Sequence, residues 1–199
     1  MKIDDYKMLF VTLGLIGILL FASPMIINII RLPAGQQFSE LYLLGPNHMI
    51  QDYPYNVEIN QNYRVYIGVV NNLRSTAYYT VYLKFQNETD MLPNATSVTA
   101  SSSLPIYELK FFLPDGGRWE SPIDFSISEA LVNANQSSIN GLSVNGLVTK
   151  VDKSAALDAN TLGFHYGLIC ELWVYNVTIS NFQYNNRYVN LQLNLIEPK

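Results

Sequence analysis

The sequence predicts a mainly β protein, in which one N-terminal transmembrane helix precedes an antiparallel β-sandwich. Residues 8–30, MLFVTLGLIGILLFASPMIINII, contain no charged side chain. After residue 38, short runs of alternating apolar and polar residues are separated by Gly, Pro and Asn, as is typical of strands joined by turns. No later stretch shows the 3.6-residue period of a long amphipathic helix.

The composition narrows the class of protein. A chain of 199 residues usually forms one domain with a small appendage. Charged residues make up 14% of it, below the roughly 25% of typical soluble proteins. The net charge is −4 and no basic cluster is present, so we expect no nucleic-acid partner. Cys170 is the one cysteine in the sequence, which excludes an intrachain disulfide and a zinc site built from several cysteines.

The apolar run 8–30 is long enough to cross a bilayer. At about 1.5 Å per residue it matches the roughly 30 Å of a hydrocarbon core. A cleaved signal peptide, cut after FAS at 21–23, is the alternative, but apolar residues continue to Ile30. We therefore expect a retained signal anchor. Gly14 and Gly17 would allow a second helix to approach closely, or are incidental glycines of a lipid-facing helix.

Basic residues and glycosylation triplets predict the topology. Lys2 and Lys7 precede the run and Arg31 follows it, which weakly favours a cytoplasmic N-terminus. Four Asn-X-Ser/Thr triplets, the acceptor pattern for N-linked glycans, all follow it, at Asn87, Asn94, Asn135 and Asn176. Of these, Asn176 is the weakest candidate because it lies within an apolar run.

These observations predict a single-pass cell-membrane protein whose bulk is extracytoplasmic. Its parts are a short cytoplasmic N-terminus (1–7), the anchor (8–30), a linker (31–37) and an outer β-sandwich domain (38–199).

Seven to nine short strands are expected in the outer domain, a number and spacing typical of a sandwich. We place strands at 38–45, 55–59, 106–113, 123–128 and 164–179, a hairpin at 62–85, and a final strand in the tail 187–199. The tail points Val189, Leu191, Leu193 and Leu195 inward and Asn190, Gln192 and Asn194 outward. Residues 129–162, rich in Asn, Ser and Ala, are either a long loop or a short helix.

The hairpin at 62–85 has one apolar and one polar face. Its inward residues are Tyr63, Val65, Ile67 and Val69 on the first arm and Tyr79, Val81, Leu83 and Phe85 on the second. Arg64, Tyr66, Thr80, Tyr82 and Lys84 are expected to face water. Tyr66, Tyr78 and Tyr82 form an outward row, which predicts a face that binds a protein partner, since tyrosine is enriched at interfaces. The alternative is that they are simply good strand formers.

Four blocks of the chain stand out, namely FSELYLLG at 38–45, QDYP at 51–54, GVVN at 68–71 and ELW at 171–173. Together they resemble an archaeal membrane-protein family known only as a domain of unknown function, numbered sixteen-sixteen. The resemblance covers residues 8–197. It implies an archaeal cell-envelope protein with an immunoglobulin-like outer domain, and it implies no known activity and no functional residues.

The sequence shows no catalytic or metal-binding motif. A blue-copper site needs two His and a Cys, usually with one His just after the Cys, whereas His48 and His165 both precede Cys170. We expect His165 to be packed or hydrogen-bonded, and Cys170 to be a buried, protonated packing residue or else an intersubunit disulfide partner. The pairs Asp115/Glu120 and Glu88/Asp90 offer too few oxygens for calcium and are expected to be solvated turn residues.

We therefore expect a non-catalytic glycoprotein without a cofactor. Its predicted role is a structural or accessory subunit of a membrane or cell-surface assembly, with the lipid bilayer and other proteins as partners. Two alternatives stay open. One is a tethered module that binds a carbohydrate or another small molecule. The other is an accessory subunit of a membrane-bound enzyme complex whose chemistry lies in partner chains.

Overall fold

The structure is a computed structural model that describes residues 6–18, 36–159, 161 and 163–196. Contacts divide the chain into two compact units, residues 1–37 and 38–199, and each is described by itself. In the first unit, residues 6–18 form a helix that contains Gly14 and Gly17. Among the helical residues described here, no helix is both long and apolar enough to cross a membrane. Residues 19–30 of the expected anchor lie outside the described ranges.

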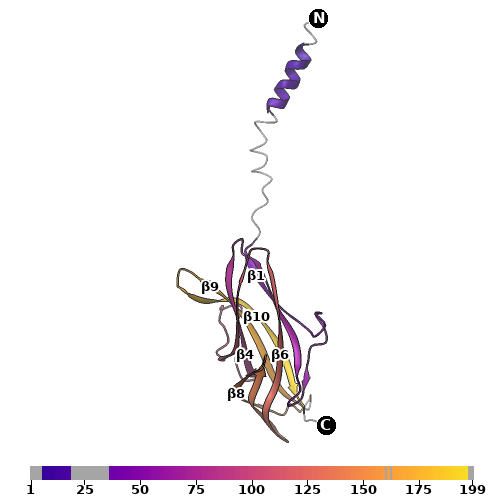
Figure 1. The fold of residues 1–199 in the computed structure, drawn as a ribbon, viewed down its shortest axis with the longest axis vertical. Helices are drawn as coiled ribbons and strands as arrows, with labels where there is room; N and C mark the ends of the chain where they lie inside the picture. The colour runs from indigo at the N-terminus through magenta and orange to yellow at the C-terminus, as the bar shows by residue number, and fades with distance from the viewer. Residues whose placement is uncertain (1–5, 19–35, 160, 162, 197–199) are drawn as a thin grey trace. The chain divides into compact units, whose positions relative to one another are not determined.

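The second unit is a β-sandwich of two sheets (Figure 1), which confirms the predicted mainly β fold. Within the described residues, the first sheet has the order β1-β3-β6-β7-β8 and the second the order β2-β10-β9-β4-β5. Neighbouring strands are antiparallel except for the short parallel pair β2–β10. The strands are β1 (Phe38–Leu44), β2 (Asn56–Val57), β3 (Tyr63–Asn72), β4 (Ala77–Asn87), β5 (Pro105–Leu113), β6 (Arg118–Asn133), β7 (Gln136–Val144), β8 (Leu147–Ala156), β9 (Phe164–Asn176) and β10 (Asn181–Leu195).

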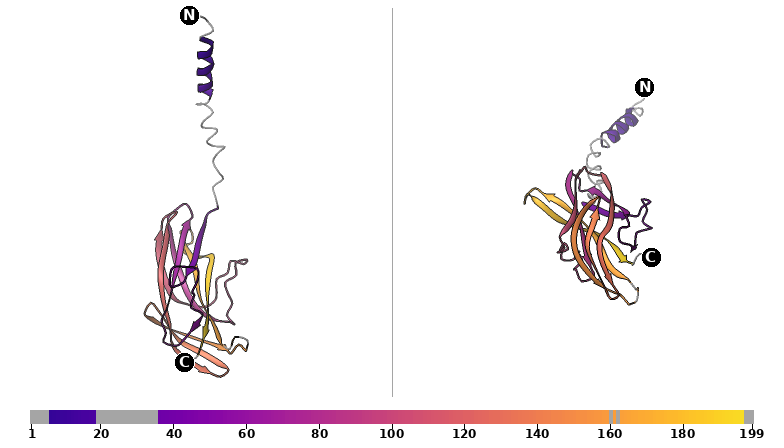
Figure 2. Two further views of the ribbon diagram at one scale, coloured as in Figure 1. Left: turned by 90° about the vertical axis from the view of Figure 1, so that its right-hand side faces the viewer. Right: turned by 60° about the horizontal axis from the view of Figure 1, so that its bottom comes forward.

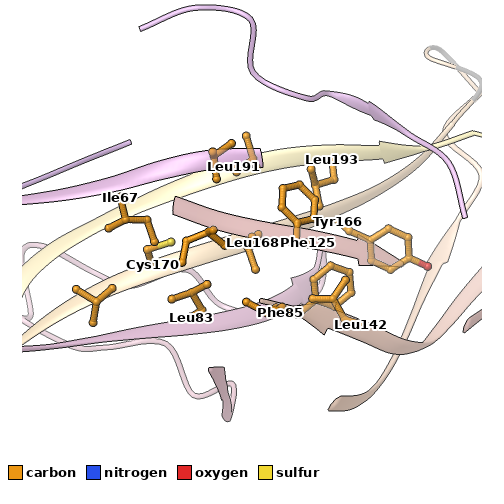
Figure 3. Close-up of a cluster of buried hydrophobic side chains, with 14 of the residues drawn as sticks. Ile67, Leu83, Phe85, Phe125, Leu142, Tyr166, Leu168, Cys170, Leu191 and Leu193 are labelled. Carbon is orange, nitrogen blue, oxygen red and sulfur yellow. The ribbon is translucent and has the colours of Figure 1, made fainter. Parts of the chain in front are cut away.

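The core lies between the two sheets, and the two layers are seen from two further directions in Figure 2. Figure 3 shows Ile67 and Phe125 of the first sheet pointing into the same space as Leu83 and Leu168 of the second, and all four are buried. Burying a side chain of this size contributes about 1.5–3 kcal/mol, so this layer is the main source of stability. The predicted inward positions of β3 and β4 are confirmed, since every one of them is buried or half-buried.

The predicted hairpin at 62–85 is wrong, because β3 belongs to the first sheet and β4 to the second. The chain crosses between the sheets at Asn71, whose side chain is buried. Its Nδ2 donates to the carbonyls of Ser75 and Leu113, both at 2.8 Å, and its Oδ1 accepts from the backbone N–H of Leu73 at 3.0 Å. The alternating sequence pattern does not distinguish the two arrangements. Two strands paired in one sheet and two strands in opposite sheets of a sandwich both bury every second residue.

Residues 129–162 are mostly strand where the structure describes them. Strand β6 runs on to Asn133, and β7 and β8 form a hairpin through the Asn145–Gly146 turn. Both turn residues have positive φ, 48° and 82°, as the favoured two-residue hairpin turn requires. Register irregularities between Ile127 and Ala130 interrupt the alternation of β6, which is why the pattern was ambiguous here.

The strands expected at 38–45, 106–113 and 164–179 are found with small changes at their ends, whereas those expected at 123–128 and in the tail are parts of the longer strands β6 and β10. The exception is the strand expected at 55–59, which pairs only over Asn56–Val57. In the tail, Leu191, Leu193 and Leu195 are buried as predicted. Asn194 is also buried, against expectation, because Gly163 lies directly on its amide and its Nδ2 donates to Asn56 Oδ1 at 3.0 Å.

Candidate functional site

Part of the outer face of the second sheet contacts the segment 88–104, which joins β4 to β5. Thr80 and Lys84, predicted to face water, are buried, and that prediction is wrong. Lys84 is covered by this segment, since its Nζ donates to the Ser101 carbonyl. The segment is held by hydrogen bonds along its length. One example is Asn186 Nδ2 of β10, which donates to the carbonyl of Ala95 at 3.0 Å.

A buried ion pair fixes this covering segment. Lys84 Nζ lies 2.8 Å from Glu171 Oε2, and both side chains are almost fully buried. Glu171 Oε1 accepts from the backbone N–H of Ser101 at 2.7 Å, and Lys84 Nζ donates to the Ser101 carbonyl at 2.7 Å. Trp173 Nε1 donates to the other carboxylate oxygen at 3.1 Å. We call Lys84, Ser101, Glu171 and Trp173 the buried clamp. Its charges are paired and hydrogen-bonded, as buried charges must be.

Beside the clamp lies a cleft of about 560 Å³ on the same outer face. Three amide residues of the outer face line it, Gln86 of β4 and Asn190 and Gln192 of β10, and we therefore call it the amide cleft. Asn87 lines it as well, but its Nδ2 donates to the Ser154 carbonyl and its Oδ1 accepts from the backbone N–H groups of Thr89 and Asp90. The volume of the cleft is within the range of small-molecule sites. The lining residues are Tyr55, Gln86, Asn87, Glu88, Asp90, Leu92, Thr161, His165, Tyr166, Gly167, Asn190 and Gln192.

Gly167 keeps the floor of the cleft open. A Cβ atom at this position would lie 2.8 Å from Asn190 Oδ1, so any side chain would displace this amide, and it would be in ordinary contact with Gln86 Cγ at 3.5 Å. Asn190 Oδ1 is buried and accepts no hydrogen bond from the described residues. Gln86 is buried as well, and its Oε1 accepts from Ser101 Oγ at 3.4 Å, which links the cleft to the clamp.

The wall of the cleft is formed by two rings. Tyr55 is exposed, and its ring centroid lies 6.4 Å from that of His165. His165 Nε2 is hydrogen-bonded to Thr161 Oγ1 at 2.6 Å and lies 3.3 Å from Asp158 Oδ2. The prediction that His165 is a hydrogen-bonded histidine is therefore confirmed, and its ring orientation is fixed.

The carboxylates singled out in the sequence do not cluster. Asp90 pairs with Lys153 at 2.6 Å, Glu120 pairs with His48 at 2.6 Å, and Asp115 accepts from the backbone N–H of Arg74 at 2.8 Å. Among the described residues, no group of three or more His, Cys, Asp or Glu side chains is placed to hold a metal ion.

The chemistry of the amide cleft suits a ligand rich in hydroxyl groups. Amide side chains both donate and accept hydrogen bonds, as hydroxyl groups do, and Glu88 adds an acceptor at the rim. The Tyr55 ring offers a flat apolar surface beside these polar groups. Such a mixture of an aromatic wall and a few polar groups is typical of a binding site.

The predicted tyrosine row does not form one face. Tyr66 lies on β3 of the first sheet, where its ring stacks on His48 with centroids 3.7 Å apart. Tyr78 and Tyr82 lie on β4 of the second sheet, on the opposite outer face of the sandwich. There Tyr78 stacks on Phe112 at 4.3 Å, and Tyr82 meets the edge of Trp173 at 5.6 Å.

The four candidate glycosylation asparagines differ in their surroundings. Asn94 and Asn135 are exposed. Asn87 is half-buried, and its Nδ2 donates to the Ser154 carbonyl at 2.7 Å. Asn176 ends β9, and its Nδ2 donates to Gln183 Oε1 at 3.1 Å.

Cys170 is buried in the core, as predicted. Burial, with a smaller contribution from the charge of Glu171, raises the pKa of its thiol to about 12. The thiol is therefore protonated at neutral pH, and a thiol in that state is a poor nucleophile.

Comparison with known protein families gives one match. Residues 32–136 fit the model described as Domain of unknown function (DUF1616). The chain belongs to this family. This confirms the resemblance seen in the sequence, whereas the archaeal and membrane features that the resemblance implies are not part of the match. The curated proteins include no match to the chain.

Several solved structures are distantly similar to this DUF1616 member. The CARDB domain of a Pyrococcus furiosus protein, in complex with di-metal ions, is 8% identical with a TM-score of 0.40, over 80% of this chain and 90% of that one. A Listeria innocua β-glucosidase in complex with glucose is 10% identical, also at 0.40, over 81% of this chain and 16% of the enzyme. A PapD-like domain of human CEP192 is 8% identical with a TM-score of 0.35, and the match covers 85% of this chain and 92% of that domain. At these scores no ligand or activity can be transferred.

Sequence reasoning missed both the cleft and the clamp. The alternation of the tail predicts that Asn190 and Gln192 face outward, but nothing local in the sequence indicates that Gln86 and Gly167 lie beside them. Lys84 and Glu171 are 87 positions apart, and only the pairing of β4 with β9 brings them together.

Proposed function

We propose that this DUF1616 protein is a non-catalytic, membrane-anchored binding module of the cell envelope, and that the amide cleft binds a hydroxyl-rich ligand such as a carbohydrate. The observation that carries the proposal is that Gln86 and Gln192, which flank Gly167 on the neighbouring strands, line one cleft together with Asn190 and Tyr55. The uncharged run 8–30 supports the anchor, and the four glycosylation triplets after it support an extracytoplasmic location. The family match carries no activity.

The test is a titration of the full-length protein in detergent with glucose, galactose, mannose, N-acetylglucosamine and their oligomers, followed by calorimetry. We expect saturable binding of at least one sugar. Tyr55→Ala and Gln192→Ala, both at exposed positions, should each weaken it about tenfold, which corresponds to about 1.4 kcal/mol. Tyr66→Ala, on the opposite sheet, is the control and should bind normally. If no sugar binds, or if the control loses as much affinity, the ligand assignment is wrong.

A second role, accessory subunit of a membrane or surface assembly, is favoured by a different surface. Beside the His48–Tyr66 stack, Met49 and Ile50 are exposed on the segment that follows β1. Exposed apolar groups next to aromatic rings are typical of protein interfaces. Native mass measurement after mild detergent extraction tests this role. A monomer that carries no other protein would exclude it, and release of a bound protein by Ile50→Asp would support it.

A further inference from the structure

One end of the β-sandwich has an exposed apolar surface, which we call the apolar end. It consists of Phe38 at the start of β1, Phe112 near the end of β5, and Val177 and Ile179 in the β9–β10 turn. Val177 is 80% exposed, Phe112 70% and Ile179 58%. Figure 1 shows that the β9–β10 hairpin projects from the sandwich at the end where β1 begins. Large apolar side chains exposed together usually mark a contact surface.

Aromatic packing supports the projecting hairpin. Tyr78 of β4 stacks on Phe112 and lies 5.0 Å from the ring of Phe182 on β10. The rings of Tyr175 and Phe182 pack edge to face at 5.4 Å across the hairpin. These contacts join the hairpin to the rest of the second sheet, so Val177 and Ile179 are held outward on a structured base.

The charge pattern at this end fits a lipid surface. From Trp173 to Asn186 the chain contains no charged residue. Arg74, Arg118 and Arg187 lie around the border, and Arg187 Nε donates to the carbonyl of Ser39 at 3.2 Å. The carboxylates of Asp115, which accepts from the backbone N–H of Arg74, and of Glu40 lie at the same end, so the three arginines leave the border basic on balance. An apolar centre bordered by basic side chains matches the layering of a membrane interface, where acyl chains lie beneath phosphate groups.

The chain also enters the domain at this end. Phe38 begins β1, and Ser39 next to it is hydrogen-bonded to Tyr79. Seven residues, 31–37, separate Phe38 from the end of the apolar run. Even a fully extended seven-residue chain spans at most about 25 Å. If 8–30 crosses the bilayer, as proposed above, the start of β1 therefore stays close to the lipid headgroups.

We propose that the apolar end docks onto the bilayer, with Val177, Ile179 and Phe112 inserted at the lipid interface. This inference rests on the proposed anchor but is independent of the ligand of the amide cleft. Docking would set the orientation of the sandwich relative to the membrane, beyond what a tether alone provides. Amphipathic surfaces of this kind bind through buried apolar area together with attraction of basic groups to anionic lipids.

Site-specific fluorescence tests the proposal. The full-length protein is placed in nanodiscs of phosphatidylcholine and phosphatidylglycerol that contain a lipid with a nitroxide near its headgroup. An environment-sensitive dye is attached to Ile179→Cys or, as a control, to Leu131→Cys. Leu131 has a similar exposure, 64%, and lies near the β6–β7 turn at the opposite end of the sandwich. Cys170 is buried and can stay in place.

We expect the dye at 179 to shift to the blue and to be quenched at least twofold more than the dye at 131. Val177→Asp should abolish this difference. Equal quenching at the two positions in protein that stays in the nanodisc would overturn docking while leaving the anchor intact. A blue shift without quenching, together with a dimer mass, would overturn it in favour of a second copy. Loss of the protein from the nanodisc in alkaline carbonate would overturn both the anchor and docking.

Discussion

Asn71 and Tyr79 are joined by a buried hydrogen bond although they belong to different sheets. Tyr79 Oη donates to Asn71 Oδ1 at 3.1 Å and is also hydrogen-bonded to Ser39 Oγ at 2.7 Å. One phenol thus ties β4 of the second sheet to β1 and β3 of the first. Burial, opposed by the Ser39 bond, raises the pKa of Tyr79. The phenol therefore stays protonated at neutral pH.

We expect Tyr79→Phe to lower the free energy of unfolding by about 1–3 kcal/mol. The substitution keeps the ring packed but leaves Ser39 Oγ, which is buried, without this partner. Urea denaturation followed by fluorescence measures the change. Tyr55→Phe, at an exposed position, is the matched control and should change little. Equal stability of the two variants would show that the bond does not hold the sheets together.

The crossing at Asn71 shows what a pattern of alternation can and cannot predict. The pattern predicts the strands and their buried faces correctly, because apolar residues at alternate positions face the core whether or not the two strands pair. Examples are Val65, Ile67 and Val81, which are all buried. β3 and β4 belong to different sheets, and the buried amide of Asn71 holds the connection between them by donating to the carbonyls of Ser75 and Leu113. No local pattern encodes a bond between residues 42 positions apart.

The same limit applies to the candidate site. Thr80 and Lys84 occupy outward positions of β4, as predicted, but both are buried, and Lys84 is buried because the segment 88–104 lies over it. That segment has no alternation of its own and no apolar period, so its path over the sheet was not predictable. Its attachment depends on Glu171, which the sequence places within an apolar run.

The buried clamp should be strongly coupled to stability. We expect Lys84→Met to reduce the free energy of unfolding by about 3–5 kcal/mol, because it leaves the Glu171 carboxylate buried without its cation. The double variant Lys84→Met/Glu171→Gln should lose less than the sum of the two single variants. Chemical denaturation of the two single variants and the double variant gives the coupling free energy between Lys84 and Glu171.

An exposed ion pair provides the control for the clamp. Lys150 and Asp152 lie 3.0 Å apart on β8, and their side chains are 79% and 57% exposed. Lys150→Ala should leave stability unchanged within error, since solvent screens such a pair. If Lys150→Ala lowered the free energy of unfolding as much as Lys84→Met does, burial would not explain the contribution of the clamp to stability.

Stability should decline in alkaline solution because of Cys170. Burial raises the pKa of the folded thiol to about 12, above its ordinary value of 9.0. Between these values the folded state binds more protons than the unfolded state, so the free energy of unfolding falls as the pH rises from 9 toward 12, and it is unaffected below 9. Burial also raises the pKa of Tyr184 to about 12, which acts in the same direction.

Urea denaturation at pH 8, 9, 10 and 11 measures this dependence. Cys170→Ala should make the decline shallower, although it also lowers stability at every pH by leaving a small cavity. Thiol labelling gives an independent measurement, since the native protein should react with iodoacetamide at pH 8 only after unfolding. Rapid labelling of folded protein would show that the thiol is accessible and that the burial argument fails.

The glycosylation triplets lead to a prediction ranked by position. If the domain is extracytoplasmic, as proposed, glycans should occur at the exposed Asn94 and Asn135. Occupancy should be lower at Asn87, because a glycan on its Nδ2 would compete with the hydrogen bond to the Ser154 carbonyl of β8. Peptide mass spectrometry of native protein measures each site, with Asn94→Gln and Asn135→Gln as controls. Glycan at Asn87 with bare Asn94 and Asn135 would contradict the ranking, and four bare sites would count against the extracytoplasmic assignment.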